Sequence, residues 1–426
     1  MSISSLKTMA TGESTCKHDE CMTAVEWKGT RTIKVNEHRP KSKLADPTDA
    51  IVRIIYTTIC GSDLHLYHNE IPGMQDGDIV GHEGVGVVEE VGAKVTKVQP
   101  GDKVVISAVI ACGACDYCKE RMYSCCDTTN PRDRIAALFG YSHITGGYDG
   151  TQAEYVRVPY ADTNLLHISQ DTFSKLQEKL LLLSDVACTG WHACELSEVG
   201  HGDVVGIWGC GPIGLMAASW AKNRGASRII AIDDIPSRLK LARDIGAETI
   251  NFKEIKNTVG KIRELVPKGL DVGIDAVGFR YASKSMRHKV EKMLYAETDS
   301  VDVVDEVVKS VKKGGRIALI GDYIGVANHF PIGALMEKSL TLRGGQLHPQ
   351  KYWPILLPKL LSGEAFVDFF THRMPLTDAP RAYKVFDAKE DDVVKIVLTT
   401  KATDDLGSSS VESRPIEATV ITETIV

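Results

Sequence analysis

Hydrophobic residues follow two different rhythms along this chain. Between residues 22 and 159, short runs rich in Val, Ile and Thr are separated by turns that contain Gly or Pro, a pattern typical of strands. From residue 203 onward, apolar runs of strand length alternate with segments of helical length. The first rhythm predicts a partly open β-barrel, and the second predicts a parallel sheet covered by helices on both faces.

The expected elements can be placed by residue. In the first part we expect a strand, a turn at Lys28-Gly29 and a second strand within 22–35, then strands at 50–58, 78–91, 102–106 and 152–159. In the second part we expect strands at 203–208, 228–233, 248–251, 270–277, 316–321 and 340–344, with helices at 212–223, 236–245, 256–266 and 301–311. A helix at 352–361 and a strand at 393–398 follow, and the long charged connection between 278 and 299 has room for a helix at 284–295.

Composition limits the class of protein. The 426 residues suffice for two domains, and a net charge of -6 with 25% charged residues gives no reason to expect a nucleic acid or an acidic membrane as partner. No apolar run is long enough to span a bilayer. Residues 1–21 lack the apolar core of a secretory signal, so we expect a disordered extension and a cytoplasmic protein. Residues 401–426, rich in Ser, Thr, Asp and Glu, are expected to form a disordered tail.

A glycine-rich turn indicates a dinucleotide site. The segment Gly209-Cys210-Gly211-Pro212-Ile213-Gly214 matches G-x-G-x-x-G, follows an expected strand and opens an expected helix. Gly209 permits the tight turn, Gly211 lets a pyrophosphate approach the backbone, and Gly214 allows close helix–strand packing. Pro212 and Ile213 then begin the helix whose N-terminus attracts the phosphates.

The residues after the next strand favour NAD over NADP. Asp233 ends that strand, where a carboxylate accepts hydrogen bonds from ribose hydroxyls and repels a 2′-phosphate. Asp234 adds negative charge, whereas Arg238 is a cation that could tolerate the phosphate.

Cysteines are clustered in one loop. Of eleven in the chain, Cys112, Cys115, Cys118 and Cys126 form C-x2-C-x2-C-x7-C, and four thiolates in one short loop make a closed tetrahedral zinc site. Cys125 is adjacent and could replace Cys126 as the fourth ligand, so spacing alone leaves both open.

A second set of metal-binding residue types is scattered. Cys60, His82 and Asp185 offer a thiolate, an imidazole and a carboxylate, a set that suits zinc and leaves its fourth position open for chemistry. They lie far apart in sequence, and a lone buried Cys or His is usually a packed or hydrogen-bonded residue. Spacing therefore does not join these three residues.

The combination of motifs resembles the zinc-containing medium-chain alcohol dehydrogenase family. The resemblance rests on Cys60-Gly61-Ser62-Asp63, the glycine-rich segment 81–92, the four-cysteine loop and the later dinucleotide fold, and it covers roughly residues 22–398. It implies an α/β protein with a GroES-like, partly open β-barrel catalytic domain and a doubly wound Rossmann coenzyme domain. We expect the catalytic domain at 22–186 and 346–400, and the Rossmann domain at 187–345.

The resemblance also implies the metal ligands. Cys60 matches the first catalytic ligand, and His82 of the Gly-His-Glu motif matches the second. Asp185 stands where many members have Cys, as in the glutathione-independent formaldehyde dehydrogenase and dismutase branch. The segment 150–156 and the insertion after residue 278 resemble that branch too. Family spacing selects Cys126, rather than Cys125, for the structural site.

The implied activity is a reversible, zinc-dependent transfer of hydride between an alcohol, or a hydrated aldehyde, and NAD, giving an aldehyde or ketone. Ser62 would accept the alcohol proton and pass it toward a solvent-facing His65, and Glu83 is the acid that can approach the zinc transiently. The resemblance implies two zinc ions per chain, a small alcohol or aldehyde as substrate, and a homo-dimer or homo-tetramer. An aldehyde dismutase with tightly bound NAD, or a non-catalytic nucleotide-binding protein that retained the fold, remain alternatives.

Overall fold

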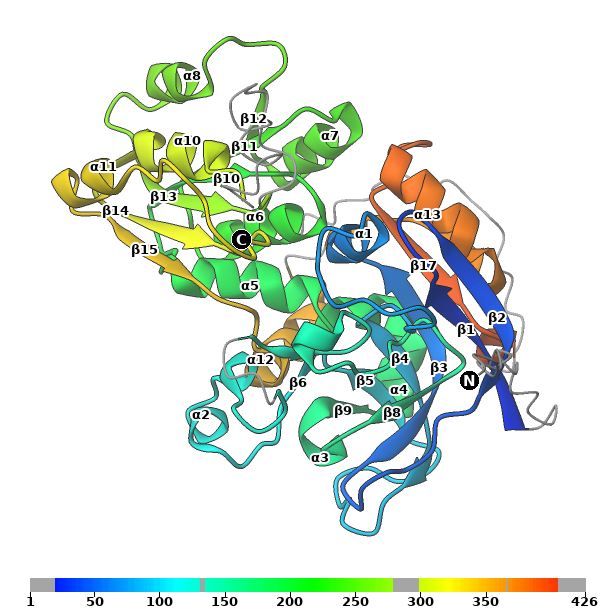
Figure 1. Cartoon of the computed structure of the whole chain (residues 1–426). Coiled ribbons are helices and arrows are strands. Elements are labelled where there is room, and N and C mark those ends of the chain that lie inside the picture. Colours follow the sequence, from blue (N-terminus) through cyan, green and yellow to red (C-terminus); the bar gives the residue numbers. More distant parts are fainter. Residues whose placement is uncertain (1–19, 131–134, 279–298, 365–366, 405–426) are drawn as a thin grey trace, which may run out of the picture.

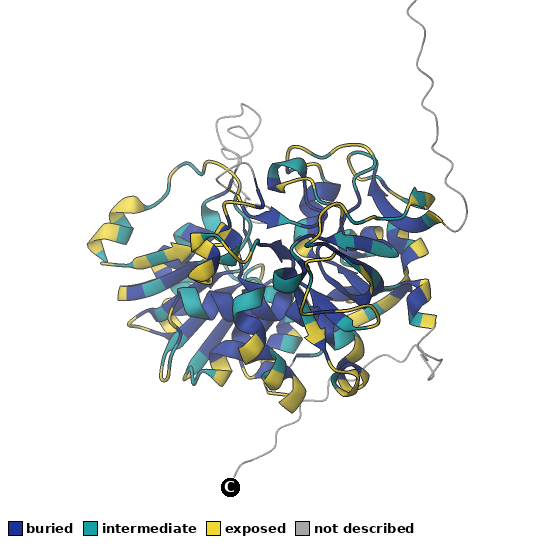
Figure 2. Ribbon diagram, turned by 90° about the horizontal axis from the view of Figure 1, so that it is seen from below, coloured by how far each residue is buried: buried dark blue, intermediate teal, exposed yellow. Residues whose placement is uncertain are grey.

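The computed structural model describes residues 20–130, 135–278, 299–364 and 367–404. Its strands gather into two lobes, each built on one large sheet (Figure 1). Buried residues line the strands of both lobes, and exposed residues lie on the outer helices and loops (Figure 2). Within the described ranges, no helix combines the length and hydrophobicity needed to cross a bilayer.

The first lobe is a seven-stranded sheet with the order β16-β17-β3-β4-β5-β9, in which β8 also pairs with β3. Strands from the end of the chain thus add to the N-terminal ones, because β17 pairs antiparallel with β3. The strands are β3 (Ala50–Ile59), β4 (Gly84–Val91), β5 (Lys103–Ile106), β8 (Tyr155–Val158), β9 (Leu165–Ile168), β16 (Phe370–Pro375) and β17 (Lys395–Thr399). The smaller sheets are the hairpin of β1 (Cys21–Trp27) with β2 (Ile33–Pro40), and the pair of β6 (Val109–Ile110) with β7 (Ala137–Leu138).

The second lobe is a six-stranded parallel sheet with the order β12-β11-β10-β13-β14-β15. Alternate residues of β10 point to opposite faces: Val205 and Ile207 join one hydrophobic cluster, and Trp208 joins another. The sheet is therefore buried on both sides, as the expected doubly wound fold requires. Its strands are β10 (Val204–Trp208), β11 (Arg228–Asp233), β12 (Glu248–Asn251), β13 (Leu270–Asp275), β14 (Val311–Leu319) and β15 (Thr341–Gly344).

Helices connect these strands. The helices expected at 212–223, 236–245, 256–266 and 301–311 are present, with small shifts of their ends. Among the helices of more than four residues, the hydrophobic pattern did not predict those at 61–67, 170–176, 186–196, 332–337 and 379–388. The helices of more than four residues are α1 (Gly61–Tyr67), α4 (Gln170–Leu176), α5 (Val186–Leu196), α6 (Pro212–Asn223), α7 (Pro236–Ile245), α8 (Thr258–Leu265), α10 (Asp302–Ser310), α11 (Ile332–Glu337), α12 (Pro349–Ser362) and α13 (Ala379–Ala388).

Three sequence expectations need correction. The strand expected at 78–91 begins only at Gly84, because Gly81 adopts a left-handed backbone with φ +92 and bends the chain before it. Cys21, placed in a disordered extension, pairs with Pro40 in β1. The first residues of the expected disordered tail form the short helix α14 (Lys401–Asp404), where Thr403 donates a hydrogen bond to the Ile55 carbonyl. The helix expected at 284–295 lies outside the described residues.

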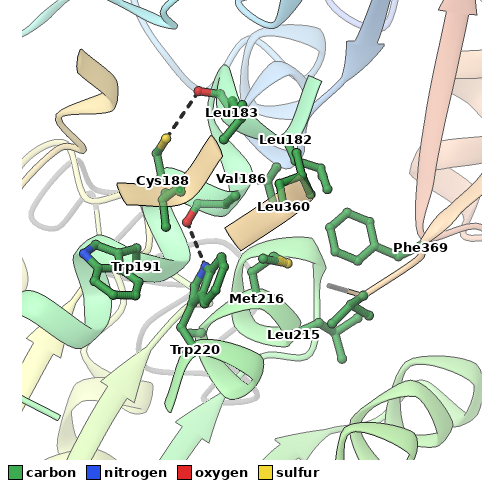
Figure 3. Close-up of a cluster of buried hydrophobic side chains, with 14 of the residues drawn as sticks. Leu182, Leu183, Val186, Cys188, Trp191, Leu215, Met216, Trp220, Leu360 and Phe369 are labelled. Atoms are coloured by element: carbon green, nitrogen blue, oxygen red, sulfur yellow. Dashed lines mark hydrogen bonds between the residues drawn. The ribbon is translucent and has the colours of Figure 1, made fainter. Parts of the chain in front are cut away.

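One hydrophobic cluster joins the two lobes. Side chains of α5 and α6 pack with α12 and with Phe369, which precedes β16 (Figure 3). The Trp220 indole donates to the Ala187 carbonyl at 3.0 Å, and the Cys188 thiol donates to the Leu183 carbonyl at 3.2 Å. Because α5 starts immediately after Asp185, this shared core holds Asp185 in position relative to the parallel sheet.

A buried histidine pair lies where α5 meets α12. His192 Nδ1 is 2.6 Å from the Tyr352 hydroxyl, His348 Nδ1 accepts from the Ser124 backbone N–H at 3.1 Å, and the two imidazole rings are 5.0 Å apart. Burial lowers the pKa of His192 to about 3 and that of His348 to about 4, and their mutual proximity lowers the pKa of His192 further. Both rings are therefore neutral in the folded protein at neutral pH.

This pair predicts a pH-dependent stability. Unfolded histidine binds a proton below about pH 6.5 while the buried ring does not, so folding stability should fall with pH from about 6.5 down to the folded pKa values. His192→Asn should remove up to about 1.4 kcal/mol per pH unit of that slope between pH 6 and 4. Urea unfolding across this range measures it, with exposed His167→Asn as control. Equal slopes for wild type and His192→Asn would contradict the prediction.

Candidate active site

Cys60 is presented by the junction of β3 and α1. It is the N-cap of α1, and its backbone N–H donates to Asp63 Oδ2 at 2.9 Å. Asp63 in turn donates its own N–H back to the Cys60 side chain, which completes a capping box. Cys60 is thus both the N-cap of α1 and a candidate metal ligand, and its sulfur lies where β3 ends and α1 begins.

His82 lies in the bend between Gly81 and β4. A side chain at Gly81 would come within 2.5 Å of Gln152, so only glycine permits this close packing of the bend. His82 Nδ1 lies 3.3 Å from Asp63 Oδ1 and its Nε2 lies 3.3 Å from Asp185 Oδ2. A carboxylate behind one ring nitrogen is a common way to orient a metal-binding imidazole.

Asp185 is the N-cap residue of α5, with its side chain turned away from the helix N–H groups. Thr189, one helical turn later, donates its hydroxyl to Asp185 Oδ1 at 2.5 Å. Oδ2 is left facing Cys60 and His82. The helix therefore orients the carboxylate toward the other two side chains.

The distances between these three donors suit one tetrahedral ion. Zn–S and Zn–N/O bond lengths imply about 3.5 Å between a sulfur and an oxygen ligand, and about 3.3 Å between a nitrogen and an oxygen ligand. The observed separations are 3.7 Å from Cys60 Sγ to Asp185 Oδ2 and 3.3 Å from His82 Nε2 to the same oxygen. All three residues are buried. The structure thus brings together residues that sequence spacing could not join.

The electrostatics of the cluster also favour a cation. Burial on its own would lower the pKa of His82, but the neighbouring carboxylates of Asp63 and Asp185 outweigh burial and raise that pKa well above its ordinary value. Burial raises the pKa of the Cys60 thiol, so without a cation the sulfur keeps its proton. A metal ion supplies the positive charge that stabilises thiolate and carboxylate together.

Glu83 lies beside the cluster and has a partner that the sequence analysis missed. Its Oε1 accepts from Lys395 Nζ at 2.7 Å, and both side chains are almost completely buried. A carboxylate oxygen of Glu83 lies within 4.8 Å of the donor atoms of the three candidate ligands. The signal for Lys395 was present as one charged residue inside the apolar run 393–398, but nothing local pairs it with Glu83.

Ser62 and His65 both lie on α1 and line the same cavity as the ligand cluster. Ser62 is not the cap of this helix, since Cys60 occupies that position. His65 was expected to face solvent, and this is wrong: its side chain is only 6% exposed. It lies between two carboxylates, with Nδ1 2.8 Å from Glu70 and Nε2 3.7 Å from Asp322.

The four-cysteine loop closes on itself. Sγ atoms of Cys112 and Cys118, and of Cys115 and Cys126, are 3.9 Å apart, close to the roughly 3.8 Å expected between two thiolates on a tetrahedral zinc. Cys125 is exposed and lies outside the cluster, so the geometry favours Cys126 as the fourth candidate ligand. Burial alone would raise the pKa of Cys126, but hydrogen bonds from the Thr129 hydroxyl and from backbone N–H groups lower it to about 6.

The glycine-rich turn lies between β10 and α6. Gly209 has φ +91, and a side chain at Gly214 would come within 1.9 Å of the Gly209 carbonyl, whereas a side chain at Gly211 would meet only the Arg238 guanidinium, at 4.0 Å. Pro212 and Ile213 are the first residues of α6. The space that a pyrophosphate needs is therefore present at the helix N-terminus.

Asp233 ends β11 and tightens this turn. Its Oδ2 accepts from the Cys210 backbone N–H at 2.6 Å. Arg238 of α7 lines the cavity nearby, as does Lys389, which follows α13 in the first lobe. Asp234 is ion-paired with Lys253. Acidic and basic groups therefore occur together at this end of the cavity.

One cavity of about 340 Å³ connects these features. At one end it is lined by the ligand cluster, Ser62 and His65, and at the other by the glycine turn, Asp233 and Arg238. It lies at the carboxyl ends of the parallel strands, between the two lobes, where open α/β sheets bind ligands. A nucleotide along it would reach the ligand cluster.

Comparisons with known proteins agree with this arrangement. A family model described as an alcohol dehydrogenase GroES-like domain matches residues 46–169, and one described as a zinc-binding dehydrogenase matches residues 212–294. A zinc-type alcohol dehydrogenase-like protein of Schizosaccharomyces pombe is 42% identical, over 88% of this chain and 90% of that protein. A formaldehyde dismutase of Pseudomonas putida is 35% identical, over 77% of this chain and 85% of its own.

Solved structures lead to the same conclusion. The alcohol dehydrogenase TADH from Thermus sp. ATN1 superimposes with a TM-score of 0.74 at 34% identity, covering 89% of this chain and all of that one (100%). The expected GroES-like and Rossmann fold is thereby confirmed. The chain belongs to the zinc-containing medium-chain alcohol dehydrogenase family.

Proposed function

We propose that this protein oxidises a small alcohol to an aldehyde or ketone, reversibly, with a zinc ion held by Cys60, His82 and Asp185 and with NAD as hydride acceptor. The observation that carries the proposal is that Asp185 Oδ2 lies within about 0.2 Å of the ideal zinc-ligand separation from both Cys60 Sγ and His82 Nε2, in the same cavity as the dinucleotide turn. A zinc ion here supplies Lewis acidity, which lowers the pKa of an alcohol, and NAD supplies the hydride acceptor.

The residues of the chain handle the proton and the geometry. Ser62 accepts the proton that leaves the substrate hydroxyl and passes it to His65 inside the cleft. Asp63 and Thr189 keep His82 and Asp185 oriented, and Glu83 is the nearby carboxylate that can move toward the ion during turnover. Lys395 offsets the charge of Glu83, since an unpaired carboxylate would be costly at this depth.

A second zinc ion is proposed at Cys112, Cys115, Cys118 and Cys126. The four thiols leave no vacant position, so the role of this ion is structural. Ser124, inside the loop, donates its hydroxyl to the Gln346 carbonyl at 3.0 Å, and Gln346 lines the cavity. The structural loop therefore supports one wall of the active site.

The acidic side chains at the end of β11 support NAD rather than NADP. Asp233 and Asp234 would repel a 2′-phosphate, although Arg238 and Lys389 lie near enough to weaken that discrimination. The second candidate activity is aldehyde dismutation with retained NAD, favoured by Asp185 as third ligand and by the similarity to a formaldehyde dismutase. The insertion that would retain the cofactor lies outside the described residues.

We also propose a homo-dimer or homo-tetramer. Within the part of the chain that the structure describes, β15 ends the parallel sheet, and α11 beside it carries the exposed side chains Ile332 and Met336, at 64% and 67% exposure. A second copy could cover this apolar edge.

The first test compares two buried cysteines near Asp185. Cys60→Ala should lose one of two zinc ions and reduce kcat/KM with simple alcohols at least about 100-fold, because the electrophile is removed. Cys188→Ala should keep both ions, since its thiol donates to the Leu183 carbonyl and is not among the clustered donor atoms. Metal analysis and NADH absorbance provide the readouts. A zinc-loaded wild type that turns over none of a broad alcohol panel would support the non-catalytic alternative instead.

The second test addresses the four-cysteine loop. Cys126→Ser should lose the structural zinc and lower the thermal midpoint by about 5–10 °C, because the loop loses the ion that closes it. Cys125→Ser is the matched control and should retain two zinc ions and the wild-type midpoint, as its side chain lies outside the cluster. Identical metal contents in both variants would refute the assignment.

The third test separates dehydrogenase from dismutase. After gel filtration has removed free nucleotide, the protein should leave formaldehyde unchanged until NAD is added, because we propose that NAD is exchanged at each turnover. Equal amounts of formate and methanol formed without added NAD would instead establish dismutation, with bound NAD released on denaturation.

A further inference from the structure

Glu70 lies behind His65 as seen from the cavity. His65 and Asp322 line the cavity and Glu70 does not. The Nε2 atom of His65 is on the cavity side, 3.7 Å from Asp322, and its Nδ1 atom is on the opposite side, 2.8 Å from Glu70 Oε2. The ring therefore separates the reaction space from Glu70.

The backbone fixes this pairing. After α1 the chain turns through Asn69, whose φ is +58, and the Glu70 backbone N–H donates to the His65 carbonyl at 2.8 Å. This is the closure typical of a helix C-terminus, and it carries the Glu70 side chain back to the ring. His65 is 6% exposed, whereas the Glu70 side chain is 29% exposed, so the carboxylate reaches solvent more readily than the imidazole does.

Because the His65 side chain is only 6% exposed, a proton on its ring does not pass directly to bulk water. A proton that enters the ring at Nε2 must leave before the next turnover, and Nδ1–H faces the Glu70 carboxylate. Among the described residues, Asp322 also approaches this ring, on the cavity side, 3.7 Å from Nε2. Asp322 lines the cavity and is too far from Nε2 for a hydrogen bond, whereas Glu70 is 2.8 Å from Nδ1 and does not line the cavity.

We propose that Glu70 is the outlet of the proton relay: His65 accepts the substrate proton at Nε2, gives the Nδ1 proton to the Glu70 carboxylate, and Glu70 releases it to water. One proton enters and one leaves, and the ring is left as the Nε2–H tautomer. A flip about the Cβ–Cγ bond then returns the N–H to the Glu70 side and a bare nitrogen to the cavity side for the next turnover. Glu70 touches neither substrate nor cofactor, so it is a positioning residue that acts through His65. The inference rests on the proposed alcohol oxidation.

The test uses the zinc-loaded protein with NAD and an alcohol that the wild type oxidises. In Glu70→Gln, the side chain can still contact His65 but cannot accept a proton. We expect NADH formation and dye-reported proton release to slow about tenfold or more, with KM nearly unchanged, and added imidazole to restore much of the rate. A shifted pH profile should accompany the loss.

The matched control is Asp387→Asn. It removes the carboxylate that lies 2.7 Å from His68, the next histidine along the same segment, and neither of these residues lines the cavity. Its kinetics should equal those of the wild type. If Glu70→Gln does not fold, Glu70→Asp provides the same comparison, because the shorter side chain cannot keep the 2.8 Å contact.

The outcomes are distinct. Wild-type rates and proton release in Glu70→Gln, or a loss that imidazole does not relieve, would overturn the role of Glu70 while leaving the alcohol oxidation intact. A wild type that forms no NADH would overturn the proposed function itself.

Discussion

The meeting of a thiol, an imidazole and a carboxylate in one buried cluster is the interaction on which this structure depends. Each comes from a different part of the fold: Cys60 from the start of α1, His82 from the bend before β4, and Asp185 from the start of α5. Burying such groups without a cation is unfavourable, because desolvation penalises every charged form. A zinc ion would offset that cost and would link the three segments that bring these side chains together.

The groups around the cluster serve its charge balance. Asp63 contacts two of the candidate ligands, because one of its oxygens accepts from the Cys60 N–H and the other faces His82. A substitution at Asp63 would therefore disturb both. The buried pair of Glu83 and Lys395 brings a compensating cation from β17, 312 residues away in sequence. Replacing either partner alone would leave an uncompensated charge, which costs more than the pair gains.

The junction of the lobes is where chemistry and cofactor come together. A common hydrophobic core through α5, α6 and α12 keeps the ligand-bearing helix aligned with the nucleotide-binding sheet (Figure 3). Asp322, at the end of the Rossmann sheet, also approaches His65 of the other lobe. The proposed substrate activation, hydride transfer and proton removal would therefore all take place at this one contact surface between the lobes.

The sequence alone determined features that are encoded within a few residues. The glycine turn at 209–214, the loop from Cys112 to Cys126 and the alternation of strands and helices were predictable because local spacing and periodicity specify them. Cys60, His82 and Asp185 were assigned as ligands only through family resemblance, because spacing does not join them. Tertiary structure decided which of these residues meet, that His65 is buried between Glu70 and Asp322, and that Lys395 pairs with Glu83. The strand β16 and the helix α13 were missed for the same reason: packing against distant segments, rather than local pattern, stabilises them.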